Sequence, residues 1–273
     1  AQRGIHIYSM KVPTFDMEQY DEMVKLTEKY NIVFQIELEL RYSAVVKRIK
    51  QLYDNGAIGK LMSFQAANTT RCPVWWLPWH GIPEKSYGKR IKLRDGDNRF
   101  RGGALADHPH IFDLIRYITG SEFDCIFAEV APNIRMELEV EDIITVVGKM
   151  KDGTAFSFDP SFSRSENRMP VIGPGWEIYP KRVEVNIILN GEKGTIMADC
   201  FGPNIYHTGL PDNRFKIRYS CTKTNNRNLM MNEFADCIRN HKMPSINLLS
   251  HKKTIEAMNA CYDSIAANSP VKL

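Results

Sequence analysis

Short apolar runs alternate with segments of helical periodicity over the first 55 residues. The runs, at 5–8 and 32–36, are rich in β-branched residues, and apolar residues recur at helical spacing over 17–30 and 43–55. Asp16 and Gln19 form a capping box ahead of the first helical segment. The order strand, helix, strand, helix is typical of a parallel α/β sheet. Because residues 1–4 resemble a helix end, we expect residues 1–58 to be the remnant of a larger α/β domain.

The pattern changes after Gly59, where strand-like segments separated by turns dominate. They are 60–68, 123–131, 143–150, 155–158, 182–189, 195–198 and 215–219. Helical periodicity predicts one continuous helix over 103–119 and two closing helices over 228–240 and 250–268. We therefore predict that residues 59–273 form an α+β domain, an open antiparallel sheet with helices packed on one face and back near the remnant. Strands 143–150 and 182–189 are apolar in both registers, which predicts a homo-oligomer assembled through the open face.

Composition excludes several classes of protein. The 273 residues are 43% hydrophobic, enough for a buried core, and the net charge of +4 forms no basic stripe for nucleic acid. The six cysteines are far apart, which argues against a disulfide scaffold and for a reducing, cytoplasmic location. No apolar run is long enough to span a membrane.

The densest group of chemically active residues lies around residues 107–110. Asp107 and His110 are three residues apart, so on a continuous helix they share a face, where a carboxylate can orient an imidazole for proton transfer. A helix start with ordinary histidines explains the same pattern. A metal site that also uses His108 and His80 is disfavoured, because His108 and His110 project from different sides of a helix. We expect no metal.

Two cations follow the predicted strands. Lys11 comes just after the first strand, at the carboxyl edge where α/β sheets bind ligands, although a solvated charge explains it equally. Arg41 follows the second strand and has no local role, whereas Ser43 is explained as a helix N-cap. The long aromatic stretch 69–101 contains Trp76 and Trp79, which can stack on a sugar, cover a core or contact another subunit.

No G-x-G-x-x-G follows any strand, and no P-loop, G-x-S-x-G or H-E-x-x-H motif occurs. The chain therefore lacks a recognisable site for the phosphates of a dinucleotide. We expect this chain alone to bind no cofactor.

Six segments, in order and spacing, resemble the glucose-fructose oxidoreductase and inositol dehydrogenase family of NAD(P)-dependent sugar oxidoreductases. They are GIHIYSMK at 4–11, LRYS at 40–43, GAIGKL at 56–61, the segment 102–117, GEKGTI at 191–196 and NEFADCI at 232–238. The resemblance covers nearly the whole chain and implies that residues 1–58 come from the nucleotide-binding domain. The domain 59–273 then binds substrate and forms the oligomer.

The resemblance also implies roles for individual residues. Lys11 would lie by the nicotinamide and the reacting hydroxyl, as a catalytic and a cofactor-binding residue, with His110 as proton donor or acceptor and Asp107 as its partner. The substrate would be a sugar, cyclitol or polyol, and a complete parent would use NAD or NADP. The residues expected to shape the substrate pocket are Arg41, Trp76, Trp79, His80 and Arg164.

This sequence departs from the family pattern around the same residues. Met10 and Val12 replace the glutamate and proline that flank the family lysine, and Asp107 and His110 are separated by three positions instead of four. The family's nucleotide-binding half is mostly missing. Two interpretations stay open: a portion of a complete oxidoreductase, or a non-redox sugar-binding or assembly module that does not bind NAD.

Overall fold

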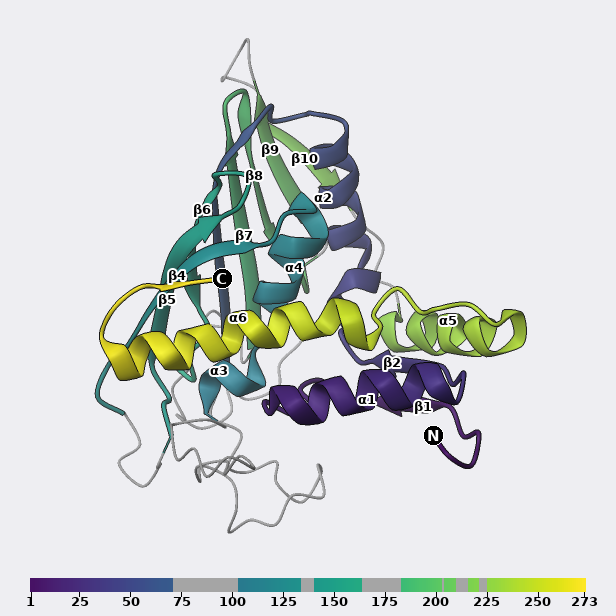
Figure 1. The fold of residues 1–273 in the computed structure, drawn as a ribbon. Helices are drawn as coiled ribbons and strands as arrows, with labels where there is room; N and C mark the ends of the chain where they lie inside the picture. The colour runs from purple at the N-terminus through teal and green to yellow at the C-terminus, as the bar shows by residue number, and fades with distance from the viewer. Residues whose placement is uncertain (71–102, 134–139, 164–182, 203, 210–215, 221–224) are drawn as a thin grey trace, which may run out of the picture.

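The computed structural model describes residues 1–70, 103–133, 140–163, 183–202, 204–209, 216–220 and 225–273. Within those ranges no helix is long and apolar enough to cross a membrane. The protein consists of a small parallel α/β unit and a large sheet with helices on one face (Figure 1). This mixed architecture confirms the fold class predicted from the sequence.

The α/β unit follows the predicted order of strand, helix, strand and helix. Strands β1 (Ile7–Ser9) and β2 (Phe34–Ile36) pair in parallel, joined by α1 (Met17–Lys29). The Asp16 carboxylate accepts a hydrogen bond from the Gln19 amide, which confirms the N-cap half of the predicted capping box, whereas the Asp16 amide donates to Thr14 Oγ1 and not to the Gln19 side chain. A 3₁₀ helix, η1 (Glu39–Tyr42), and helix α2 (Ala44–Asp54) follow.

The large sheet has nine strands in the order β10-β9-β8-β7-β3-β6-β5-β4-β11, and every neighbouring pair is antiparallel except β3 with β6. Its strands are β3 (Leu61–Thr70), β4 (Phe123–Val130), β5 (Ile144–Met150), β6 (Ala155–Asp159), β7 (Val183–Gly191), β8 (Gly194–Asp199), β9 (Asn204–Gly209), β10 (Lys216–Ser220) and β11 (Val271–Lys272). The sequence did not predict two of these strands, β9 with six residues and β11 with two.

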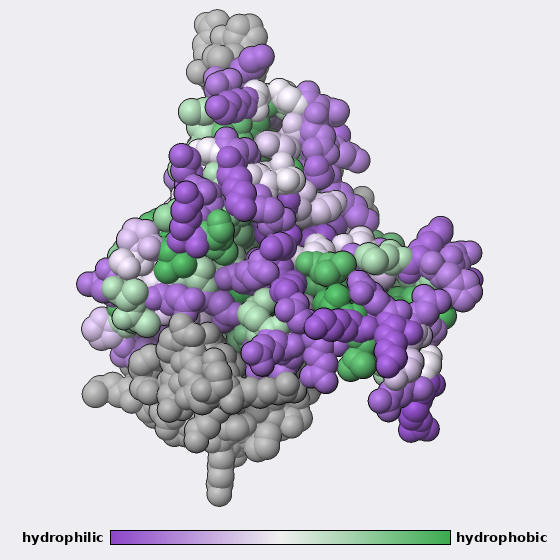
Figure 2. All heavy atoms as spheres, in the orientation of Figure 1, coloured by the Kyte–Doolittle hydropathy of each residue, from purple (hydrophilic) through white to green (hydrophobic). Residues whose placement is uncertain are grey.

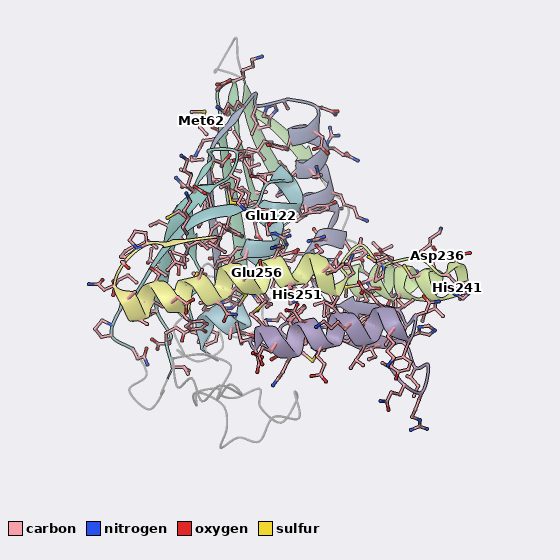
Figure 3. The ribbon with its side chains drawn as sticks, viewed as in Figure 1. Met62, Glu122, Asp236, His241, His251 and Glu256 are labelled. Atoms are coloured by element: carbon pink, nitrogen blue, oxygen red, sulfur yellow. The ribbon has the colours of Figure 1, made fainter. Side chains whose placement is uncertain are left out.

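Helices α2, α4 (His110–Thr119) and α6 (Leu248–Ala267) cover one face of this sheet (Figure 1). Helix α5 (Asn226–Asn240) packs against η1, and α6 packs against α1 and β2, so the closing helices return to the α/β unit as predicted. Figure 3 shows His251 on the side of α6 that faces α1, where its Nδ1 lies 2.7 Å from the hydroxyl of Tyr20. Hydrophilic residues cover most of the face seen in Figure 2, with smaller hydrophobic areas beside α6.

Burial alternates along the sheet strands. On β5, Ile144 and Val146 are buried on the helix side, whereas Val147, on the opposite face, is 40% exposed. None of the described helices covers this second face. The predicted assembly through the open face stays a prediction.

Two local predictions were wrong. The helix expected over 103–119 is interrupted: α3 (Ala104–Asp107) ends, and α4 begins only at His110. His108 adopts φ −117° and ψ 50°, because the ring of the following Pro109 disfavours a helical conformation there. Ser43 occupies the N-cap position of α2, but its hydroxyl donates to the carbonyl of Cys200 instead of capping the helix.

Candidate functional site

Lys11 and Asp107 meet although they are 96 residues apart. The Lys11 Nζ lies 2.8 Å from Asp107 Oδ1 and also donates to the Asp107 carbonyl oxygen. Lys11 follows the carboxyl end of β1, and Asp107 is the last residue of α3. Burial by itself would raise the pKa of Asp107, but Lys11 and His108 together hold that pKa well below its usual value. The structure thus brings together two of the three predicted catalytic residues as an ion pair.

His108 has a fixed orientation beside this pair. Its Nδ1 lies 2.8 Å from the Pro160 carbonyl oxygen, which can only accept, so Nδ1 carries the proton. Its Nε2 lies 3.9 Å from Asp107 Oδ2, and its ring packs edge-on against Phe162. Burial lowers the pKa of His108 to about 4, so the ring is neutral at pH 7.

His110 does not share a helix face with Asp107, because the chain breaks at His108. Its Nε2 instead lies 4.0 Å from Oε2 of Glu39, the first residue of η1. Its Nδ1 is buried and has no hydrogen-bond partner among the described residues. Burial lowers the pKa of His110, opposed most strongly by Glu39.

A second carboxylate, Glu37, lies at the same edge. Its Oε1 lies 3.4 Å from the Arg227 Nε, and Tyr8, in β1, is close enough for the charge of Glu37 to affect its pKa. Burial, followed by the charges of Glu37 and Glu39, raises the pKa of Tyr8 to about 12. Sequence reasoning missed Glu37 and Glu39. The rule that selected Lys11 applies to them too, because Glu37 directly follows the parallel strand β2 and Glu39 comes two residues later.

Arg41 was expected in the substrate pocket, and the structure gives its guanidinium an internal partner. Its Nε lies 2.6 Å from Asp113 Oδ2, its Nη2 lies 2.5 Å from Asp113 Oδ1, and the group sits over the Tyr117 ring. In this bidentate pair the Asp113 side chain is buried and the Arg41 side chain is 11% exposed. This contact joins η1 to α4 and accounts for Arg41 without a ligand.

The other predicted pocket residues, Trp76, Trp79, His80 and Arg164, lie outside the described residues. Within the described part of the chain, no cluster of three or more acidic, histidine or cysteine side chains could hold a metal ion.

A family model, the C-terminal domain of the GFO/IDH/MocA proteins, matches residues 46–197, more than half of the chain. Among curated proteins, the chain is 27% identical over 203 residues to the myo-inositol 2-dehydrogenase of Thermotoga maritima, covering 73% of this chain and 51% of that protein. It is also 23% identical over 211 residues to a 2,7-anhydro-N-acetylneuraminate hydratase of Mediterraneibacter gnavus, covering 74% and 48%. The chain spans about half the length of the curated relatives it matches.

Solved structures share the fold at low sequence identity. A levoglucosan dehydrogenase in complex with NADH and levoglucosan has a TM-score of 0.77 at 16% identity, with 99% of this chain and 74% of that chain covered. The aldose-aldose oxidoreductase of Caulobacter crescentus in complex with glycerol has a TM-score of 0.75 at 18% identity, covering 100% and 73%. With the match to the family model, these likenesses show that the chain belongs to the GFO/IDH/MocA family.

Proposed function

We propose that this chain is part of an NAD(P)-dependent oxidoreductase that acts on a secondary hydroxyl or ketone of a sugar, cyclitol or polyol. The observation that carries the proposal is the ion pair of Lys11 with Asp107 at the carboxyl edge of the parallel strands, where α/β sheets bind ligands. His110 faces Glu39 at the same edge. Relatives named as myo-inositol 2-dehydrogenase and levoglucosan dehydrogenase support the substrate class.

Oxidation of a secondary alcohol moves a hydride from carbon and a proton from oxygen. The nicotinamide of NAD(P)⁺ supplies the hydride acceptor when it is bound. His110 takes the hydroxyl proton, and the Lys11 ammonium stabilises the negative charge that develops on the oxygen. The Asp107 carboxylate holds that ammonium in place at 2.8 Å.

The residues present fit only one end of the dinucleotide. Lys11 provides a cation where the nicotinamide would lie, whereas the sequence has no glycine-rich turn for the phosphates. We therefore propose that residues 1–58 are the last part of a nucleotide-binding domain and that residues 59–273 bind substrate. Calorimetry with NAD⁺ and NADP⁺ on this chain should detect no micromolar binding.

The test of the activity uses the complete protein that the gene encodes. Nicotinamide absorbance is followed with a panel of sugars and polyols, for the wild type and for His110→Asn. A fall in kcat of about 100-fold or more, with nucleotide affinity retained, supports His110 as the proton carrier. Equal turnover would contradict that role. A complete protein that binds polyols but no nucleotide would establish the alternative, a non-redox binding module.

We also propose that the chain forms a homo-oligomer through the uncovered face of the sheet. The strand registers place Val147, Gln65, Ile188 and Met197 in one row across that face, together with Ser157. Val147 is 40% and Met197 46% exposed, and a second copy of the sheet would remove this apolar area from water.

A further inference from the structure

The carboxylate of Asp107 faces groups other than His110. Its Oδ1 accepts from Lys11 at 2.8 Å, and its Oδ2 lies 3.9 Å from Nε2 of His108. Lys11 also donates to the Asp107 carbonyl oxygen, so the ammonium holds both the side chain and the backbone of this residue. The partner of Asp107 is thus Lys11. The pairing of Asp107 with His110 that the family resemblance implied is not seen in this structure.

His110 instead faces a carboxylate from another part of the chain. Glu39 Oε2 lies 4.0 Å from His110 Nε2, at the limit of ion-pair distance, and the histidine is only 8% exposed. Since His110 Nδ1 has no hydrogen-bond partner among the described residues, Nε2 is the nitrogen with an acceptor nearby. The carboxylate therefore favours the ring form that carries its proton on Nε2.

A largely buried clamp fixes the two elements that carry this pair. Arg41 lies two residues after Glu39 in η1, and Asp113 lies one turn after His110 in α4. The bidentate contact between Arg41 and Asp113, at 2.5 and 2.6 Å, holds η1 against α4. Glu39 is therefore presented to His110 by a rigid support and not by a free loop.

Charged groups reach His110 from each element around it. Glu39 comes from η1, Asp113 from α4, Asp107 from α3 and Lys11 from the segment after β1. His251, on α6, is neutral at pH 7 because burial lowers its pKa to about 4. Burial alone would raise the pKa of Glu39, but His110 is the largest of several influences that bring it below its ordinary value. Glu39 is therefore an anion at neutral pH.

We propose that Glu39 is the carboxylate partner of His110 and acts as a positioning residue for proton transfer. The catalytic meaning of this pair rests on the function proposed above, whereas the pair itself does not. When a substrate hydroxyl is oxidised, its O–H bond and the C–H bond of the carbon that bears it break, and a C=O double bond forms. The proton goes to the imidazole, and NAD(P)⁺ would supply the acceptor for the hydride. Glu39 offsets the positive charge that the imidazole gains, and the reverse reaction returns both.

The test titrates His110 by NMR in the 273-residue chain with labelled histidine, its signal assigned by its loss in His110→Gln. Glu39→Gln should lower the pKa of His110, and by more than Asp107→Asn does. Glu37→Gln is the matched control, because it removes the same charge two residues away and should leave the titration close to wild type. Glu39→Asp keeps the negative charge but moves it away from the imidazole, because its side chain is shorter. The pKa of His110 in this variant should lie between the values in the wild type and in Glu39→Gln.

An unchanged pKa of His110 in Glu39→Gln, or a larger fall in Asp107→Asn, would overturn the proposal. If Glu39→Gln does not fold, Glu39→Asp decides alone: a titration equal to wild type refutes the pairing. In the complete enzyme, Glu39→Gln should also shift the acidic limb of the kcat profile to lower pH and reduce kcat roughly tenfold. A protein without redox activity would leave the NMR result intact, so the two proposals fail separately.

Discussion

Protonation of Glu141 should contribute a loss of stability as the pH rises. This residue is 4% exposed, and it joins the start of α3 to α6: its carbonyl accepts from the Ala104 amide, and its Oε1 accepts from the Leu105 amide and the Tyr262 hydroxyl. Its Oε2 is buried with no partner among the described residues. A Cβ at Gly103 would lie 2.3 Å from the Glu141 carbonyl oxygen, so glycine is needed there. Burial raises the pKa of Glu141 to about 7.

The sign of the effect follows from where the proton is held. The folded protein keeps the proton on Glu141 up to about pH 7, whereas the unfolded chain releases it near pH 4.5. Folding therefore takes up a proton between these values, and the free energy of unfolding falls as pH rises through this window. For these two pKa values, the fall from pH 5 to pH 8 is about 2.5 kcal/mol, or roughly 5 °C in Tm.

The assay is urea unfolding at a series of pH values for the wild type and Glu141→Gln. The difference between the two curves is the quantity to compare, because His108 and His251 act in the opposite direction. Burial lowers the pKa of both to about 4, so they bind protons mainly in the unfolded chain and make stability rise between about pH 4 and 6.5. The Glu141→Gln curve should lack the loss of about 2.5 kcal/mol. If the curves of unfolding free energy against pH for the wild type and Glu141→Gln are parallel, the reasoning is refuted. The control is Glu192→Gln, at an exposed position, whose curve should be parallel to that of the wild type.

Two further predictions concern the clamp and the open sheet face. Asp113→Asn should lower the free energy of unfolding by about 3 kcal/mol, because it leaves the largely buried Arg41 without its carboxylate. Asp54→Asn, at an exposed pair with Lys50, should cost less than about 1 kcal/mol in the same denaturant titration, and equal losses would contradict the argument. Replacing Val147 and Met197 together by Asp should convert the oligomer to a monomer in sedimentation. A wild-type monomer at micromolar concentration would refute assembly through this face.

Local patterns were sufficient to predict most of the fold. The alternation over residues 5–55 predicted β1, α1, β2 and α2, and β-branched runs between turns predicted most strands of the large sheet. The helix over 103–119 failed because apolar periodicity continues across the break that Pro109 imposes at His108. The pattern reflects which side chains are buried, and buried residues occur on both sides of the break, in α3 and in α4.

The sequence predicted that the candidate site lies at the carboxyl edge of the parallel strands, but it did not predict which side chains contact one another there. Lys11 could be selected because it follows a strand, but its partner, Asp107, lies 96 residues away, and no local pattern encodes such a contact. The same holds for Arg41, whose missing local role is explained by Asp113 on another helix. Pairings between elements depend on how the elements pack, so a single sequence gives the candidates without their partners.

The charges and hydrogen bonds around His108 and His110 differ. His108 donates through Nδ1 to the Pro160 carbonyl and stays neutral, so it fixes the geometry beside Asp107 without changing charge near pH 7. His110 has no such anchor among the described residues and faces an anionic Glu39, so in the proposed reaction it is the histidine that would gain and lose the proton. A proton carrier needs a partner that stabilises its charged form and a nearby cation that stabilises the alkoxide. In the proposed reaction, Glu39 and Lys11 would supply these from two adjacent strand ends, which places the proposed reaction centre at this edge of the sheet.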